Sequence, residues 1–327
     1  MLPADGGGCL AGLAALRDLD ATLIAARSGN EQAAGSAEDV CWCACPEAHD
    51  RATSEPPRLP GVSVYLDLFR YRELFLNLFR RDLKAKYKGS LLGVAWSLAH
   101  PLMLMGIYLL VFSVLWRAVG KIDHYPLYLL SGLAIWVLLA SSLNNAARSL
   151  LDMAELIKKV RFPRQLVPLS VVASQLPSFA AMLVALFALN LALLPRVRAT
   201  IWLALPLSLL VICFVAGLAL AIASANVVFR DVEHITQAVL LPWFFLTPLV
   251  YSLDTLPGGL DRHHVLKEIL RWGNPATPVI EAFRRPLYAG ELPHLWDVVY
   301  LVGAATVSLA LGAWVFRRVD DRIAVEL

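Results

Sequence analysis

The feature that most constrains this chain is a series of six long apolar segments. Each reaches, or nearly reaches, the roughly 20 residues that a helix needs to cross about 30 Å of hydrocarbon. Their approximate limits are Leu91–Trp116, Pro126–Leu143, Leu166–Leu194, Ile201–Val228, Ile235–Leu253 and Val298–Phe316. Composition agrees, because 17% of the residues are charged, against about 25% in soluble domains. The sequence predicts an all-α, polytopic membrane protein with six transmembrane helices in residues 91–327.

Residues 1–60 differ from the rest of the chain. They are rich in Ala, Gly and small polar residues and end in a Pro-rich stretch. Such a segment cannot bury enough apolar surface to offset the entropy lost on ordering, so we expect a disordered or poorly packed tail and linker. The alternative is a start codon assigned too early, with the protein beginning near Val62 or Val64. Cys41, Cys43 and Cys45 have no second Cys/His cluster at a zinc-like spacing, so no metal site is expected.

Residues 61–90 combine apolar and basic side chains. Five apolar residues recur every four positions and therefore share one side of a helix. They are Tyr71, Phe75, Phe79, Leu83 and Tyr87. The basic residues include Arg80, Arg81, Lys84 and Lys88. The pattern predicts an amphipathic helix in the membrane interface, with its basic side chains near anionic headgroups. The alternative is an ordinary amphipathic helix packed on a soluble domain.

The distribution of basic residues predicts which side of the membrane each loop and each terminus occupies. The basic residues concentrate before the first span, between spans two and three, and after span six. Basic loops stay in the cytoplasm, so both termini are expected to be cytoplasmic, in the cytoplasmic (inner) membrane. The long loop 254–296 then lies outside, and its segments Leu266–Trp272 and Asn274–Arg284 predict two short re-entrant helices. The alternative is an exposed extracytoplasmic loop.

The chain lacks the sequence signatures of an energy source. It has no Gly-x-x-x-x-Gly-Lys-Ser/Thr loop, no Gly-x-Gly-x-x-Gly after a strand pattern and no His-Glu-x-x-His. The middles of the six apolar segments contain no acidic residue, which weakens a proton- or ion-coupled mechanism. We expect no catalytic residue, cofactor or metal in this chain, and a partner that supplies the energy.

The loop between spans two and three is the candidate for receiving that energy. Ser149 and Asp152 resemble a capping box, which predicts a short helix running to about Val160. Its charged residues suit the helix dipole, with acids near the start and bases near the end. They are Asp152, Glu155, Lys158 and Lys159. The alternative is a stable connecting loop that carries positive-inside residues.

Seven short segments carry a family resemblance through their order and their position relative to the spans. They are Arg70–Leu74, Arg80–Lys84, Tyr87–Ser90, Leu92–Trp96, Leu156–Arg164, Asn226–Asp231 and Asn274–Arg284. From about Tyr65 onward the chain resembles the ABC-2 type permeases of polysaccharide exporters. That family includes the O-antigen, teichoic acid and related cell-wall polymer transporters.

The resemblance implies a homodimer of six-span subunits paired with two copies of an ABC ATPase subunit, which would hold ATP and Mg. It assigns the role of coupling helix to about Asp152–Lys159. The substrate would be a glycan or polyol-phosphate polymer on a polyprenyl diphosphate lipid, among membrane lipids and without nucleic acid. Two other functions stay open: an ABC-2 exporter of a smaller lipid or drug, and a membrane-embedded glycosyltransferase or ligase using the same lipid carrier.

Aromatic residues are the candidates for a polymer path. Sugar rings can pack their C–H faces on aromatic planes while their hydroxyls stay hydrated. The candidates are Tyr108, Phe112 and Trp116, which recur every four residues in span one, and Trp243, Phe244 and Phe245 in span five. The alternative is that these aromatics anchor the helices at the membrane interface.

The purified chain, by itself, is expected not to hydrolyse ATP, because it has no phosphate-binding loop. A phosphate-release assay on the detergent-solubilised protein checks this. Robust hydrolysis by a preparation free of contaminating ATPases would contradict the two-subunit arrangement.

Overall fold

The computed structural model describes residues 65, 70–89, 95–111, 124–160, 162–193, 200–252 and 264–326. The chain divides into two units, Met1–Arg58 and Leu59–Leu327, and every described residue belongs to the second. The predictions for the tail 1–60, with Cys41, Cys43 and Cys45, and for Phe112 and Trp116 lie outside the described residues.

The described residues form helices and turns, with no strand among them. In chain order the α-helices are α4 (Arg72–Tyr87), α5 (Ala95–Leu109), α6 (Tyr125–Asp152), α7 (Ala154–Lys159), α8 (Leu166–Leu193), α9 (Ala204–Val228), α10 (Val232–Leu246), α11 (His264–Glu268), α12 (Ala276–Arg284) and α13 (Leu295–Glu326). A 3-10 turn, η4 (Ile201–Leu203), precedes α9, and π-helical turns η7 (Ile269–Gly273) and η8 (Arg285–Ala289) follow α11 and α12. The all-α prediction is confirmed for this part of the chain.

Four helices among the described residues are long and apolar enough to cross a bilayer: α6, α8, α9 with η4, and α13. They coincide with the predicted spans two, three, four and six. The helices at spans one and five, α5 and α10, have 15 residues each. At 1.5 Å per residue α10 is about 22 Å long, which is short of about 30 Å of hydrocarbon, while α5 borders residues outside the described ranges. A multi-pass chain is therefore supported, and the count of six spans stays a prediction.

The predicted fifth span, Ile235–Leu253, is interrupted in the structure. α10 ends at Leu246, and Thr247 is extended with ψ of 132°. Pro248 is the cause, because a proline ring pushes the residue before it out of the α region. The Thr247 hydroxyl donates to the carbonyl oxygen of Trp243 at 2.8 Å and so satisfies one carbonyl of the last turn. Residues 247–252 then continue as a turn rather than as a helix.

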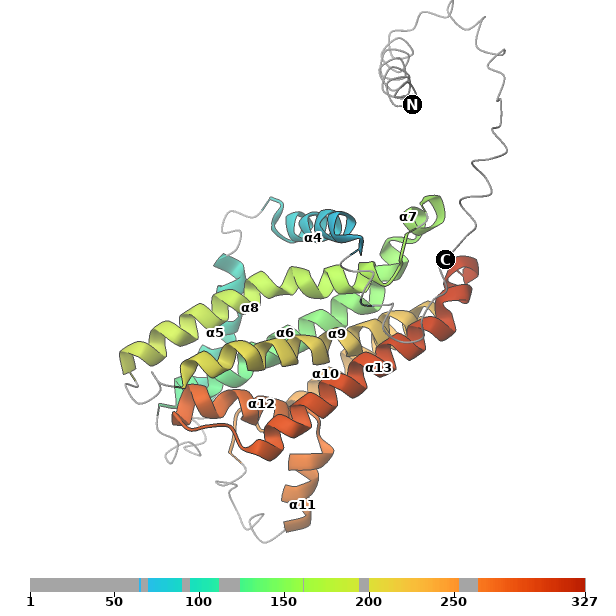
Figure 1. The fold of residues 1–327 in the computed structure, drawn as a ribbon. Coiled ribbons are helices and arrows are strands. Elements are labelled where there is room, and N and C mark those ends of the chain that lie inside the picture. Colours follow the sequence, from blue (N-terminus) through green and yellow to red (C-terminus); the bar gives the residue numbers. More distant parts are fainter. Residues whose placement is uncertain are drawn as a thin grey trace, which may run out of the picture. The chain divides into compact units, whose positions relative to one another are not determined.

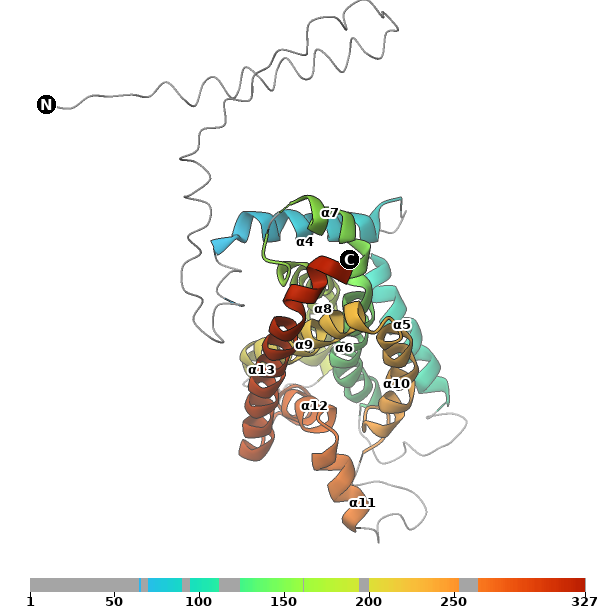
Figure 2. The ribbon, with the colours of Figure 1, turned by 90° about the vertical axis from the view of Figure 1, so that its right-hand side faces the viewer.

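The long helices lie side by side, with α7 at one end, α11 and α12 at the other, and α4 alongside α8 (Figures 1 and 2). We call the two ends the α7 end and the α12 end. α6 is the central helix, since it packs against α5, α8, α9, α10 and α12. Most of its side chains are buried, and they form the middle of the main apolar cluster.

α9 and α13 cross at two glycines. A Cβ on Gly217 would overlap the backbone of Ser308 and Leu309, and a Cβ on Gly312 would overlap the carbonyl group of Gly217. The Ser308 hydroxyl donates to the carbonyl oxygen of Phe214 at 2.6 Å across the same crossing. Lipid tails are as apolar as Leu, so helices in a bilayer associate through close packing of small residues and interhelical hydrogen bonds. This crossing therefore holds α13 to the bundle.

Replacement of Gly312 by Val is expected to force α9 and α13 apart and to lower stability by about 1–3 kcal/mol, as overpacking generally does. Gly303→Val is the matched control, because it makes the same helix-propensity change in α13 where a Cβ meets no atom within 4 Å. Melting of the two tagged variants in detergent measures the difference. Equal melting temperatures would contradict a tight crossing at Gly312.

Candidate functional site

The predicted interface segment 61–90 contains a helix, α4, whose buried side is shifted from the predicted one. Leu78 is buried, although the predicted stripe omits it, while Tyr71 is 38% exposed. The shift follows from packing, because Leu78 enters an apolar cluster built by the α7 ends of the long helices. The four basic residues predicted to face headgroups are exposed. They are Arg80, Arg81, Lys84 and Lys88.

Polar side chains also hold α4 to the first half of α8. The Ser170 hydroxyl donates to Oδ2 of Asp82 at 2.9 Å. One turn further along α4, Nζ of Lys86 donates to Oε1 of Gln175 and Oγ of Ser178, each at 2.8 Å. Residues four apart on one helix meet a neighbouring helix at matching intervals. The helix is thus fixed to α8 by residues that the amphipathic pattern did not identify.

The short helix α7 has a buried apolar side and an exposed charged side. Met153, just before it, and Ile157 are buried in the same apolar cluster as Leu78. The charged residues predicted for the coupling helix are all exposed. They are Asp152, Glu155, Lys158 and Lys159. Glu155 and Lys159 form an exposed ion pair at 3.6 Å, which contributes only about 0.3–0.5 kcal/mol. The charged side is therefore available to another protein.

The predicted capping box is wrong. Ser149 lies inside α6, and its hydroxyl donates to the carbonyl oxygen of Ala146 at 2.7 Å instead of accepting from a free N–H group. Burial of Leu150 in the packed end of α6 keeps this stretch helical, so α6 continues to Asp152. Asp152 consequently sits at a helix C-terminus, where the dipole disfavours an acid. The remaining helix α7 has six residues, with no side-chain cap at Met153.

Four described aromatics from the predicted polymer path occupy two different environments. Tyr108 of α5 stacks on Phe244 of α10 with ring centroids 5.4 Å apart, and Trp136 of α6 meets Phe244 edge-on at 5.4 Å. Phe244 is 4% exposed and has no free ring face, whereas Phe245 is 55% exposed and Tyr108 is half-buried. Trp243 also meets Trp136, at 5.8 Å. Phe244 therefore packs behind the surface that Phe245 and Tyr108 present.

Asn274 joins the start of α12 to the break after α10. Its Oδ1 accepts from the backbone N–H of Ala276 at 3.0 Å and from the indole N–H of Trp243 at 2.8 Å. Its Nδ2 donates to the hydroxyl of Thr247 at 2.9 Å. One amide thus begins a helix, holds an aromatic ring and fixes the residue at which α10 ends. The sequence predicted a short helix over Asn274–Arg284 but none of these contacts.

A buried arginine makes the second connection between α12 and the break. Arg284 is 2% exposed. Its Nη1 donates to the carbonyl oxygen of Pro248 at 3.1 Å and to Oε1 of Glu281 at 2.8 Å, and its Nη2 donates to the carbonyl oxygen of Leu249 at 3.3 Å. The break after α10 frees carbonyl groups, and Arg284 supplies donors for two of them.

The central helix is shaped to receive this arginine. The Arg284 guanidinium lies 3.7 Å from the ring centroid of Tyr128, a close cation–π contact. A Cβ on Gly132 would come within 2.7 Å of Nη2 of Arg284 and 2.8 Å of a Leu249 methyl group. Sequence reasoning missed this site, and its only signal was the position of Arg284 at the end of a family-like segment.

Comparison with known proteins identifies the class. The chain matches the ABC-2 type transporter family over residues 73–288, from α4 to η8. It is 33% identical to the O-antigen export system permease protein RfbA of Myxococcus xanthus over 250 residues, 76% of this chain and 92% of that one. An RfbA of Klebsiella pneumoniae is 28% identical over 77% of this chain and 94% of its own. The polysialic acid transport protein KpsM of Escherichia coli is 22% identical over 75% of this chain and 92% of its own.

The chain belongs to the ABC-2 type transporter family. The family is one of transporter permeases. The predicted resemblance to the permeases of polysaccharide exporters is confirmed by these relatives.

Replacement of Arg284 by Ala is expected to lower stability by about 3 kcal/mol. Hydrogen bonds to a charged group contribute about 1.5–3 kcal/mol, and the two carbonyls would lose their donor. Arg285→Ala is the matched control, because Arg285 is the next residue and its ion pair among the described residues is with the exposed Glu291, at 3.8 Å. Melting curves and the yield of monodisperse protein provide the measurement. Similar losses in both variants would refute a specific role for Arg284.

Proposed function

We propose that the chain is the transmembrane subunit of an ATP-driven exporter that moves a lipid-linked polysaccharide or polyol-phosphate polymer across the cytoplasmic membrane. The observation that carries the proposal is similarity over nearly the whole length of permeases named for O-antigen export. A further relative is named for transport of polysialic acid, another polysaccharide. A common activity toward long glycans accounts for all of these names.

The proposed arrangement is a homodimer of six-span subunits with two ATPase subunits and with both termini in the cytoplasm. α5 and α10 are then spans one and five, and α11 and α12 are the re-entrant pair. Two observations support this placement. α7, whose charged residues are exposed, lies on the same side of the bundle as α4, whose basic residues are exposed (Figure 2). At the other end the non-helical turn after α10 is covered by α12, as backbone at membrane depth requires.

The export function is tested in cells that lack this chain. Loss of surface polymer with accumulation of lipid-linked polymer inside the cell is expected, and the wild-type chain should restore export. Normal surface polymer in the deletion strain would refute the proposal and would favour an exporter of a smaller lipid or drug. Absence of polymer both inside and outside would instead indicate a synthetic enzyme.

In this proposal α7 transmits the work of the ATPase. Its buried residue, Ile157, belongs to the apolar cluster that also contains residues of α4, α6, α8, α9 and α13. A push on the exposed side of α7 would therefore act directly on the α7 ends of those helices. The ion pair within α7 is too weak to hold the helix rigid, so the packing of Ile157 would transmit the movement to the other helices.

Lys158→Pro is expected to uncouple ATP hydrolysis from export, because a proline in a helix interior costs about 3 kcal/mol. Ala154→Pro is the matched control, since residue 154 is the first residue of α7, where proline is tolerated, and it carries no charge. Surface polymer and membrane abundance, measured on the same cells, should show lost export only for Lys158→Pro. Wild-type export from that variant would place coupling elsewhere.

The neighbouring phenylalanines test the polymer path. Phe245→Ala removes an exposed ring, so export should slow while membrane abundance stays normal. Phe244→Ala empties a buried site and should lower abundance, because loss of a packed aromatic costs about 3–5 kcal/mol. Normal export with normal abundance in Phe245→Ala would contradict a path along this side of α10.

A further inference from the structure

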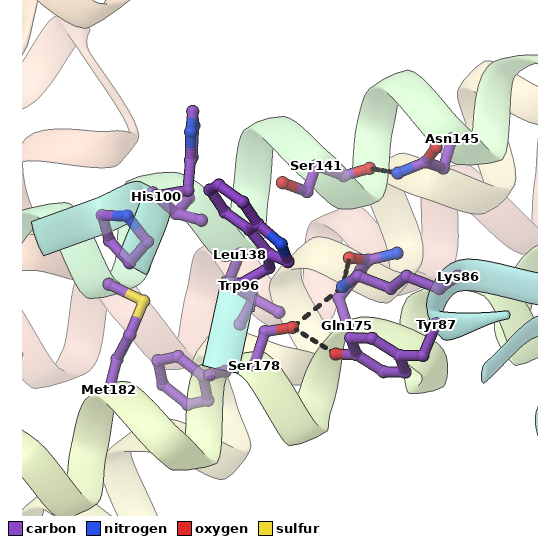
Figure 3. A pocket seen from close by; sticks show the side chains of 13 residues that line it. Lys86, Tyr87, Trp96, His100, Leu138, Ser141, Asn145, Gln175, Ser178 and Met182 are labelled. Carbon is purple, nitrogen blue, oxygen red and sulfur yellow. Dashed lines mark hydrogen bonds between the residues drawn. The ribbon is translucent and has the colours of Figure 1, made fainter. Parts of the chain in front are cut away.

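A half-open cavity of about 350 Å³ lies where α4 ends and α5 begins (Figure 3). Lys86 and Tyr87 form one side of it, and Trp96 and His100 stand on α5 at its exposed rim. The opposite walls are contributed by α6 and α8. Its volume falls in the range of about 300–1,000 Å³ that small-molecule sites occupy.

The cavity is polar at one end and apolar at the other. In Figure 3, Lys86 and Tyr87 converge on the hydroxyl of Ser178, while Met182 lies at the far end beyond Trp96. Phe179, next to Ser178 on α8, is buried and apolar. Such a division suits an amphiphile, with hydrogen-bonding groups for its head and hydrocarbon contacts for the first part of its tail.

The polar end is positively charged and has no acid to balance it. None of the lining residues is Asp or Glu. In the part of the chain that the structure describes, no carboxylate forms an ion pair with Lys86, whose Nζ donates to the neutral Gln175 and Ser178. The side chain of Lys86 is exposed as a whole, but the protein around the amine removes part of its hydration and lowers its pKa below the usual value. An anionic ligand would offset this loss of hydration, because charge-assisted hydrogen bonds are roughly twice as strong as neutral ones.

We propose that this cavity binds the phosphate-bearing headgroup of a lipid, with Lys86 on a phosphate oxygen and the first methylene groups of the tail between Trp96 and Met182. Two lipids share that chemistry: an anionic phospholipid of the bilayer and a polyprenyl diphosphate carrier. Only the second source rests on the proposed function. A phosphate group is required in either case, because the cationic end forms stronger hydrogen bonds with an anionic head than with a neutral one.

The test measures binding of three lipids to the purified full-length chain by native mass spectrometry at matched concentrations. The lipids are undecaprenyl diphosphate, phosphatidylglycerol and the phosphate-free diacylglycerol. The variant Lys86→Gln removes the charge and keeps a polar side chain, and Lys86→Arg keeps the charge. Lys84→Gln is the matched control, because Lys84 is an exposed lysine of the same helix that does not line the cavity.

At least one phosphate-bearing lipid should bind at least tenfold more tightly than diacylglycerol. Lys86→Gln should lose about tenfold in that affinity, and Lys86→Arg and Lys84→Gln should stay within about threefold of the wild type. A preference for undecaprenyl diphosphate identifies the carrier as the ligand, and equal or tighter binding of phosphatidylglycerol identifies a bilayer lipid.

Equal binding of diacylglycerol, or equal losses in Lys86→Gln and Lys84→Gln, would overturn the proposal. If Lys86→Gln fails to fold, the comparison of lipids on the wild-type chain still decides. Because no step involves ATP or export, failure here leaves the proposed function untouched.

Discussion

The need to satisfy every backbone polar group away from water governs this structure, and it acts most visibly where α10 stops. Pro248 ends the helix and leaves carbonyl groups at 248 and 249 without intrahelical donors. Arg284 reaches them from α12, and Asn274 fixes the residue before the proline. α12, α10 with the turn after it, and the central helix α6 are therefore parts of one hydrogen-bonded unit. Gly132 belongs to it as well, because a side chain there would displace the arginine.

Elsewhere the helices are held by close approach and by a few polar contacts, as expected where lipid competes for apolar surface. The glycine crossing brings the backbones of α9 and α13 together, and Ser308 adds a hydrogen bond across it. α4 is likewise held by a few polar contacts, because Asp82 and Lys86 form hydrogen bonds with side chains of α8. Such contacts need particular side chains at particular places and are sensitive to single substitutions.

α4 and α7 pack into one apolar cluster but expose different side chains. α4 and α7 have different exposed charges, yet Leu78 of one and Ile157 of the other enter the same apolar cluster. A displacement of α7 would reach α4 through that cluster, and through α4 the cavity at Lys86. The proposed contact with the ATPase and the proposed lipid cavity are thus connected by packed side chains.

The sequence by itself determined the helical class, four of the long spans, the short helices after α10 and the family. These follow from hydropathy, proline positions and local motifs, which act within a few turns of one helix. Only the tertiary structure decided that Ser149 stays inside α6, that Phe244 is buried beside the exposed Phe245, and that Arg284 closes the break at Pro248. Each of these depends on a neighbour far away in the chain. The partner against which a side chain is buried and the hydrogen bonds between helices have no periodic signature in sequence, so they become visible only when the helices are packed.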